Sequence, residues 1–194
     1  MCNHYRHHPE SISTWREHIG WDLYDRLPET DLWPKRQALI VRNEGGRKAL
    51  DSMAWGVPLT APGKRVGTTV TKHITNVRNL ASPFWKSMLA KPSQRCLVPF
   101  TSFAEPKIGA GREEHWFAVN GASLCAFAGI WRATDAGNAF AFLTCDPNPL
   151  VAPLHPKAMP VILDPDDYDR WLETDYADAC QLAAPYPSQL MSVA

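Results

Sequence analysis

The chain has 194 residues, 45% of them apolar, with 20 Lys and Arg residues balancing 20 Asp and Glu residues, so it is long enough to bury one hydrophobic core. No apolar run reaches the roughly 18 residues of a membrane-spanning helix, and nothing resembles a secretory signal. Five widely spaced cysteines without a CxxC pair argue against a disulfide framework or a zinc site, so we expect one soluble, cytoplasmic domain over residues 1–194 with free thiols and no metal or cofactor.

The second residue of the chain is a cysteine, Cys2. If Met1 is removed, its thiol and α-amine form a 1,2-aminothiol, which condenses with an aldehyde to an imine and then closes through sulfur to a thiazolidine. The amine titrates near ~8 and the thiol near ~8.5, so a fraction of each nucleophile is deprotonated at neutral pH. The alternative is that Cys2 is an incidental residue without a role.

The next elements in chain order are a helix and a hairpin. Apolar residues at helical spacing predict a helix over Ser11 to Ile19, which ends at Gly20. A β-hairpin is predicted with strands over residues 37–43 and 50–57, joined across the turn Glu44–Arg47.

The middle of the chain is strongly basic. Residues 1–100 carry 15 Lys or Arg against 8 Asp or Glu, whereas residues 101–194 carry 5 against 12. Such an imbalance predicts a phosphate-binding surface; the alternative is a solvated face that the acidic second half balances in space. The stretch from Ser52 to Phe100 contains no acidic residue and seven basic ones: Lys64, Arg65, Lys72, Arg78, Lys86, Lys91 and Arg95.

Two polar residues within this basic stretch are candidate ligand contacts. Asn76 and Arg78 are two residues apart in HITNVRN, so from an extended segment both side chains would point to the same side. Alternatively, Asn76 serves a turn. A second helix is predicted from Ser82, with Pro83 in its first turn, to a point before Pro92.

An apolar strand is predicted over residues 95–105, and it ends in Glu105. A carboxylate at the mouth of an apolar strand loses solvation, which raises its pKa toward that of a general acid or base. The alternative is a strand-end charge that faces water. His155 lies in a proline-flanked loop, where a histidine can shuttle protons near neutral pH or simply form polar surface.

The remaining elements complete the predicted fold. Residues 115–121 are predicted to form a hairpin with residues 123–132 across Asn120-Gly121, and the strand over 139–145 follows the turn Asp135–Gly137. A strand over 158–163 precedes a helix from Asp164 through Trp171. Runs of strands with irregularly interspersed helices predict an α+β domain on an antiparallel, barrel-like sheet with a few short flanking helices.

Six motifs, taken in chain order, resemble the SRAP (SOS response-associated peptidase) family. They are MCN-x-Y at the start, WGVP at 55–58, NVRN at 76–79, RCLVPFTSFAE ending at 105, FAGIW at 127–131 and HPKAMPVIL from 155. The resemblance implies that Cys2 is a covalent nucleophile and that Asn76 contacts its backbone and the adduct. It further implies that Glu105 is the acid or base beside Cys2, and that His155 donates or accepts a proton as the ring opens and closes.

The resemblance also implies the partner and the reaction. The partner would be single-stranded DNA with an abasic site, whose open-chain deoxyribose offers the aldehyde that an aminothiol captures. A reversible thiazolidine on Cys2 would protect the lesion during the DNA damage response, and we expect a monomer without membrane contact. The DNA contacts expected from the basic stretch and the His155 loop are Arg78, Lys64, Arg65, Lys72, Lys86 and Lys157.

Two other functions stay open. The family name implies an N-terminal-cysteine hydrolase or autopeptidase, in which Cys2 attacks an amide, and the crosslink chemistry implies a lyase-like activity. A noncovalent module that binds single-stranded DNA would need no chemistry at Cys2.

Overall fold

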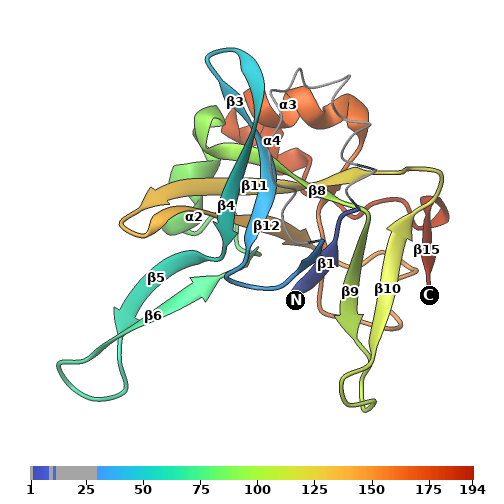
Figure 1. The fold of residues 1–194 in the computed structure, drawn as a ribbon, viewed down its shortest axis with the longest axis horizontal. Helices are drawn as coiled ribbons and strands as arrows, with labels where there is room; N and C mark the ends of the chain where they lie inside the picture. The colour runs from blue at the N-terminus through green and yellow to red at the C-terminus, as the bar shows by residue number, and fades with distance from the viewer. Residues whose placement is uncertain (1, 9–10, 12–29) are drawn as a thin grey trace.

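Five strands close into a barrel in the computed structural model, which describes residues 2–8, 11 and 30–194 (Figure 1). The ring order is β12-β4-β3-β8-β11, and β11 pairs back to β12. All neighbours in the ring are antiparallel except β12 and β4, which are parallel. The barrel strands are β3 (Gln37–Glu44), β4 (Arg47–Trp55), β8 (Arg95–Phe100), β11 (Cys125–Thr134) and β12 (Gly137–Cys145).

This barrel confirms the predicted fold class and two of the predicted hairpins. The β3–β4 hairpin turns at Gly45 and Gly46, both with positive φ, and β11 turns into β12 just before Gly137. The interior is packed closely: a Cβ on Gly129 of β11 would lie 2.7 Å from the Cys96 sulfur, so only glycine fits there.

A second, five-stranded sheet lies beside the barrel, in the order β15-β10-β9-β1-β2. Its central strand β9 continues from β8 of the barrel after a break at Thr101, whose backbone N–H donates to the Arg6 carbonyl at 2.7 Å. The single strand predicted over 95–105 is therefore two strands in two sheets. The strands of this sheet are β1 (His4–Arg6), β2 (Asp31–Leu32), β9 (Ser102–Pro106), β10 (Glu114–Val119) and β15 (Met191–Val193).

The hairpin predicted across Asn120-Gly121 is wrong. Strand β10 pairs with β9 and β15, whereas β11 pairs with β8, β12 and β14 (Ile162–Leu163). The Asn120 backbone N–H donates to the Leu190 carbonyl at 2.8 Å, so this connection carries the chain from the second sheet to the barrel. A turn dipeptide indicates a change of direction, but it does not decide which strand the chain meets next.

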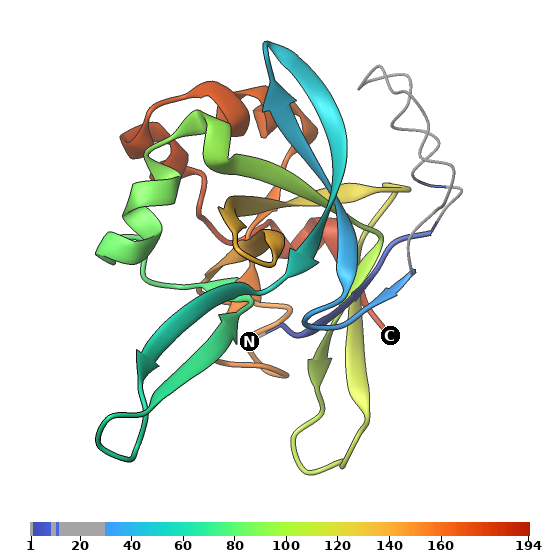
Figure 2. The same cartoon turned by 60° about the vertical axis from the view of Figure 1, so that its left-hand side comes forward.

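Two hairpins project as arms from the same side of the molecule, and strand β1 begins between their bases (Figure 2). One arm is β9–β10. The other is β5 (Val57–Pro62) with β6 (Thr69–Ile74), which the sequence did not predict. Gly56, at φ 129°, lets the chain leave β4 for this arm while its N–H donates to the Phe140 carbonyl at 2.8 Å.

The helices are short and flank the barrel (Figure 1). Helix α2 confirms the prediction after Ser82, whereas the helix predicted from Asp164 begins as a 3-10 turn, η2, before α3. The helix predicted over 11–19 lies outside the described residues, except for Ser11. Over the described ranges, no helix combines the length and apolarity needed to cross a bilayer. The remaining elements are α2 (Pro83–Leu89), α3 (Tyr168–Glu173), α4 (Tyr176–Gln181), η1 (Pro92–Gln94), η2 (Pro165–Asp167), η3 (Ser188–Leu190), β7 (Asn76–Val77) and β13 (Met159–Pro160).

Candidate active site

Cys2 is fully buried two residues before β1, and polar side chains hold its backbone in place. Asn76, on β7 against the barrel, donates from Nδ2 to the Cys2 carbonyl at 2.8 Å. The neighbouring Thr75 donates from Oγ1 to Asn3 Oδ1 at 2.9 Å. These contacts fix the two residues before β1 from the β7 side, while pairing of His4 with Ala104 fixes the start of β1 from the β9 side.

Glu105, one residue after Ala104 on β9, is the carboxylate of the site. Its side chain is fully buried, and burial raises its pKa to about 7. Because β1 and β9 pair next to Cys2, the Glu105 charge acts on the thiol: burial first, and then this carboxylate, raise the pKa of Cys2 well above its ordinary value. The thiol is therefore protonated at neutral pH, whereas Glu105 can both donate and accept a proton there.

His155 reaches the site from the loop before β13. Its Nδ1 lies 2.9 Å from the Ala158 carbonyl, and its Nε2 lies 3.4 Å from Glu105 Oε2. A carbonyl only accepts, so Nδ1 carries the hydrogen in the neutral ring and Nε2 presents its lone pair to Glu105. Burial lowers the pKa of His155, which favours this neutral form at pH 7. Glu105 and His155 thus form a carboxyl–imidazole pair that can relay a proton.

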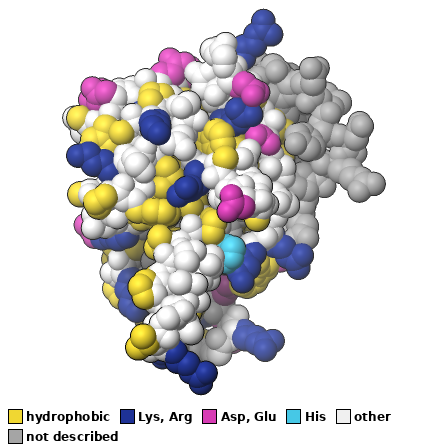
Figure 3. Space-filling model, turned by 90° about the vertical axis from the view of Figure 1, so that its left-hand side faces the viewer, with side chains coloured by type: hydrophobic (Ala, Val, Ile, Leu, Met, Phe, Trp, Pro, Cys, Tyr) yellow, Lys and Arg dark blue, Asp and Glu magenta, His cyan; other side chains and the backbone are white. Residues whose placement is uncertain are grey.

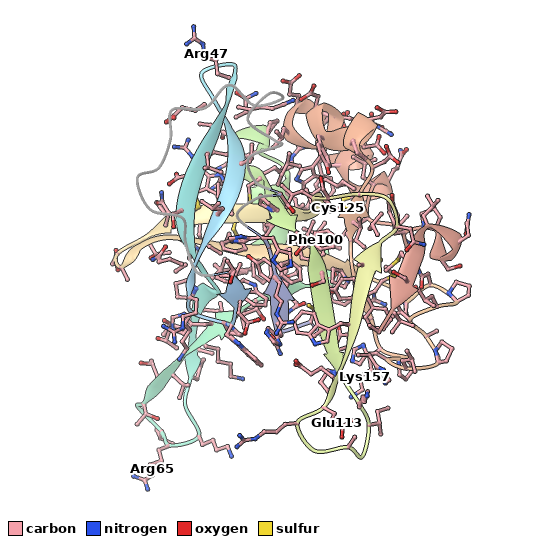
Figure 4. The ribbon with its side chains drawn as sticks, turned by 45° about the vertical axis from the view of Figure 1, so that its right-hand side comes forward. Arg47, Arg65, Phe100, Glu113, Cys125 and Lys157 are labelled. Carbon is pink, nitrogen blue, oxygen red and sulfur yellow. The ribbon has the colours of Figure 1, made fainter. Side chains whose placement is uncertain are left out.

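The basic residues predicted to contact DNA are more dispersed than Asn76, Glu105 and His155, which the structure brings together with Cys2. Arg78 is exposed but forms an ion pair with Asp146, and Lys86 on α2 lies over the Tyr176 ring at 5.2 Å. Lys157 is exposed two residues after His155 (Figure 4). The exposed residues Lys64, Arg65 and Lys72 all belong to the β5–β6 arm.

The basic residues of the β5–β6 arm make one end of the molecule positive. Figure 4 labels Arg65 at the tip of this arm. Figure 3 shows the side of the molecule from which the arm projects, with Lys and Arg side chains at its lower end. The acidic second half of the chain does not cancel the charge of the arm. Seven of its twelve acidic residues lie in residues 164–178, the segment around α3 and α4, and the arm projects away from these helices (Figure 1). This placement favours an anion-binding surface over a balanced solvated face.

Sequence analysis missed the residues that surround the start of β1. His4 places Nδ1 at 2.7 Å from Glu114 and Nε2 at 2.7 Å from Asp31, and its ring stacks on Trp33. Partial burial opposes ionisation of Asp31, but hydrogen bonds from Arg6 and His4 lower its pKa overall. Thr75 and Asn3 were missed too, because short polar residues in these segments give no periodic signal.

The buried carboxyl group predicts a pH-dependent difference in stability between the wild type and Glu105→Gln. The pKa of Glu105 is raised in the folded state, so between about pH 4.5 and 7 the unfolded chain loses its proton first and wild-type stability falls as the pH rises. Glutamine lacks this penalty. We therefore expect the free energy of unfolding of the variant, relative to that of wild type, to increase by about 1–3 kcal/mol as the pH rises from 4 to 8. Urea unfolding at both pH values measures it, and a difference independent of pH would contradict the buried-acid assignment.

The fold and the cluster together define a β-barrel protein whose candidate active site centres on a cysteine at the start of the chain. The chain belongs to the SRAP family, because the family model described as SOS response associated peptidase (SRAP) matches residues 1–194. Membership supports a role associated with DNA damage and the SOS response, with peptidase-like chemistry, and it implies an interaction with DNA.

Solved structures share this fold. A protein from Bordetella bronchiseptica is 23% identical with a TM-score of 0.79, over 100% of this chain and 98% of that one. A protein from Bacteroides thetaiotaomicron is 19% identical with a TM-score of 0.78, over 99% and 90% of the two chains. A phage-related protein from Bordetella bronchiseptica is 20% identical with a TM-score of 0.74, over 100% and 93%. The comparison with curated proteins found no match.

Proposed function

We propose that this protein captures abasic sites in single-stranded DNA through a reversible thiazolidine on Cys2, after removal of Met1. The observation that carries the proposal is the position of Cys2. Asn76 holds its carbonyl at 2.8 Å, and Glu105, which pairs with His155, is near enough for its charge to raise the pKa of the Cys2 thiol. An aminothiol next to a group that titrates near neutral pH has what condensation with an aldehyde needs.

The protonation states of the site suggest the order of the steps. The Cys2 thiol is protonated, so the freed α-amine attacks the aldehyde carbon first and gives a carbinolamine. Glu105, in its acid form, protonates the hydroxyl, which leaves as water and yields an iminium ion. The Cys2 sulfur then adds to the same carbon as its proton passes to the Glu105–His155 pair, and the ring closes. Reversal needs the same proton returned to sulfur.

The direct test mixes the protein lacking Met1 with an oligonucleotide that contains one abasic site. We expect an adduct that survives denaturant, and none with a tetrahydrofuran analogue, which has no aldehyde. The tetrahydrofuran strand still binds noncovalently, so it separates capture from binding. Binding to both strands without any adduct would favour the single-strand-binding alternative, and cleavage of peptide substrates without an adduct would favour the hydrolase.

Salt and two charge variants test the DNA surface. If the basic stretch contacts about three to five phosphates, affinity for the tetrahydrofuran strand should fall with log salt at a slope of roughly −2 to −4. Arg78→Ala should weaken binding and flatten the slope by about 0.7. Asp146→Asn is the matched variant: it releases Arg78 from its ion pair and should strengthen binding. Titrations by fluorescence anisotropy measure the affinity and its salt dependence. A slope of zero would mean that the basic stretch is an ordinary solvated face.

A further inference from the structure

Asn3 is the residue that directly follows the candidate nucleophile. Among residues 2–5 it alone is exposed, whereas Cys2, His4 and Tyr5 are buried. Consecutive Cα atoms are about 3.8 Å apart, so a molecule bonded to Cys2 necessarily lies close to Asn3. The proposed mechanism uses no group of this side chain.

A chain of hydrogen bonds determines which end of the Asn3 amide faces outward. The Cys2 carbonyl only accepts, so the Asn76 group at 2.8 Å from it is the amino group, Nδ2. The same Nδ2 donates to Thr75 Oγ1 at 2.7 Å, and the Thr75 hydroxyl in turn donates to Asn3 Oδ1 at 2.9 Å. Asn3 Oδ1 therefore faces Thr75. The Asn3 amino group points away from it, and no hydrogen bond to another described residue uses its two N–H groups.

Thr75 holds this amide at the base of the basic arm. The Thr75 carbonyl accepts from Trp55 Nε1 at 3.1 Å and from the Phe142 backbone N–H at 3.3 Å, so it is fixed to the barrel. Thr75 directly follows β6, and β1 begins between the bases of the two arms (Figure 2). The outward amino group of Asn3 therefore lies next to Cys2 and at the foot of the arm that carries Lys64, Arg65 and Lys72.

We propose that Asn3 donates from Nδ2 to one of the two phosphates that flank the captured sugar. The inference rests on the proposed function, because a deoxyribose bonded through C1′ to Cys2 carries both phosphates within a few bonds. Phosphate oxygens only accept, and asparagine side chains are common donors to them. The amide is uncharged and held at its oxygen, so it orients the strand by a directional bond, whereas the Lys and Arg residues of the arm attract it.

Substitutions in the protein and in the DNA, made separately and together, test this contact. The protein lacks Met1, and the strand carries the tetrahydrofuran analogue, which forms no adduct. One flanking phosphate at a time is replaced by a neutral methylphosphonate. We expect Asn3→Ala to weaken binding of the unmodified strand about threefold to tenfold. On the contacted side, the methylphosphonate should weaken binding to wild type more than binding to Asn3→Ala, by a similar factor.

Asn3→Asp is the matched variant. Its carboxylate still accepts from the Thr75 hydroxyl but presents a negative oxygen in place of the amino group. It should therefore bind the unmodified strand more weakly than Asn3→Ala does. The methylphosphonate on the contacted side should strengthen binding to Asn3→Asp, although it weakens binding to wild type. A methylphosphonate several nucleotides away should change the affinity of all three proteins by the same factor. Equal effects of each flanking methylphosphonate on the three proteins would overturn the proposal.

The adduct assay separates this contact from the capture chemistry. The same proteins are mixed with an abasic strand, and the denaturant-stable adduct is measured. An adduct with wild type, together with equal methylphosphonate effects in all three proteins, would overturn the Asn3 contact and leave capture intact. The opposite signs in wild type and Asn3→Asp, without an adduct, would support the phosphate contact and overturn capture.

Discussion

Replacing Cys2 by Ala will abolish the denaturant-stable adduct with abasic DNA, and replacing it by Ser will leave at most an imine that borohydride can trap. The reason is that ring closure needs sulfur: a serine hydroxyl adds to an iminium carbon far less readily, while the α-amine stays available in both variants. The expected loss is complete within the sensitivity of a denaturing gel.

The control for this prediction concerns the amine rather than the thiol. A version that retains an N-terminal tag before Cys2 keeps the sulfur but has an amide in place of the amine, so it should be as inactive as Cys2→Ala. Noncovalent binding to a tetrahydrofuran strand should survive in all three proteins and shows that they are folded. Undiminished crosslinking by the tagged protein would contradict the aminothiol mechanism and indicate that the thiol alone is the nucleophile.

Glu105→Gln and His155→Ala will slow adduct formation by roughly 10² to 10⁴, the usual contribution of a positioned acid or base. Both variants should still reach a stable adduct at long times, because Cys2 is intact. The pair differs in reversal: His155 Nε2 faces Glu105 at 3.4 Å, and the sulfur leaving the ring must regain a proton, so His155→Ala should slow release at least as much as formation.

Two time courses measure these effects: accumulation of the adduct, then its release in excess competing abasic DNA. The rate of formation by wild type should change around neutral pH, where Glu105 titrates with a pKa of about 7, and Glu105→Gln should lose that dependence. Wild-type rates in both directions for His155→Ala would make the histidine a bystander of the reaction.

Local sequence signals predicted the parts of the fold that local geometry decides. The glycines between Glu44 and Arg47 specify the β3–β4 turn, and Pro83 marks the start of α2. The same reasoning failed at Asn120-Gly121 and at Thr101. At both places the chain passes between two sheets, and the partners that decide its path, Leu190 and Arg6, are distant in sequence.

The candidate site shows the same division. Cys2, Asn76, Glu105 and His155 come from four separate segments, and neither periodicity nor spacing places them together. Their grouping came from the order of six motifs. The residues that orient them, Thr75 and Asn3, and the layer of His4, Trp33 and Trp116, depend on contacts between β1, β7 and β10 that no single segment encodes.

The pairing of β1 with β9 delays folding of the N-terminal strand during synthesis of the protein. Tyr5 lies opposite Phe103, so the first strand leaves the ribosome long before its partner exists. At about 5–20 residues per second, translation of the intervening segment takes roughly 5–20 s. During that interval the peptide bond before Cys2 is open to an aminopeptidase, and afterwards Cys2 is buried. Methionine excision would therefore compete with folding, and slow or incomplete excision during rapid synthesis would leave a fraction of molecules folded with a blocked amine.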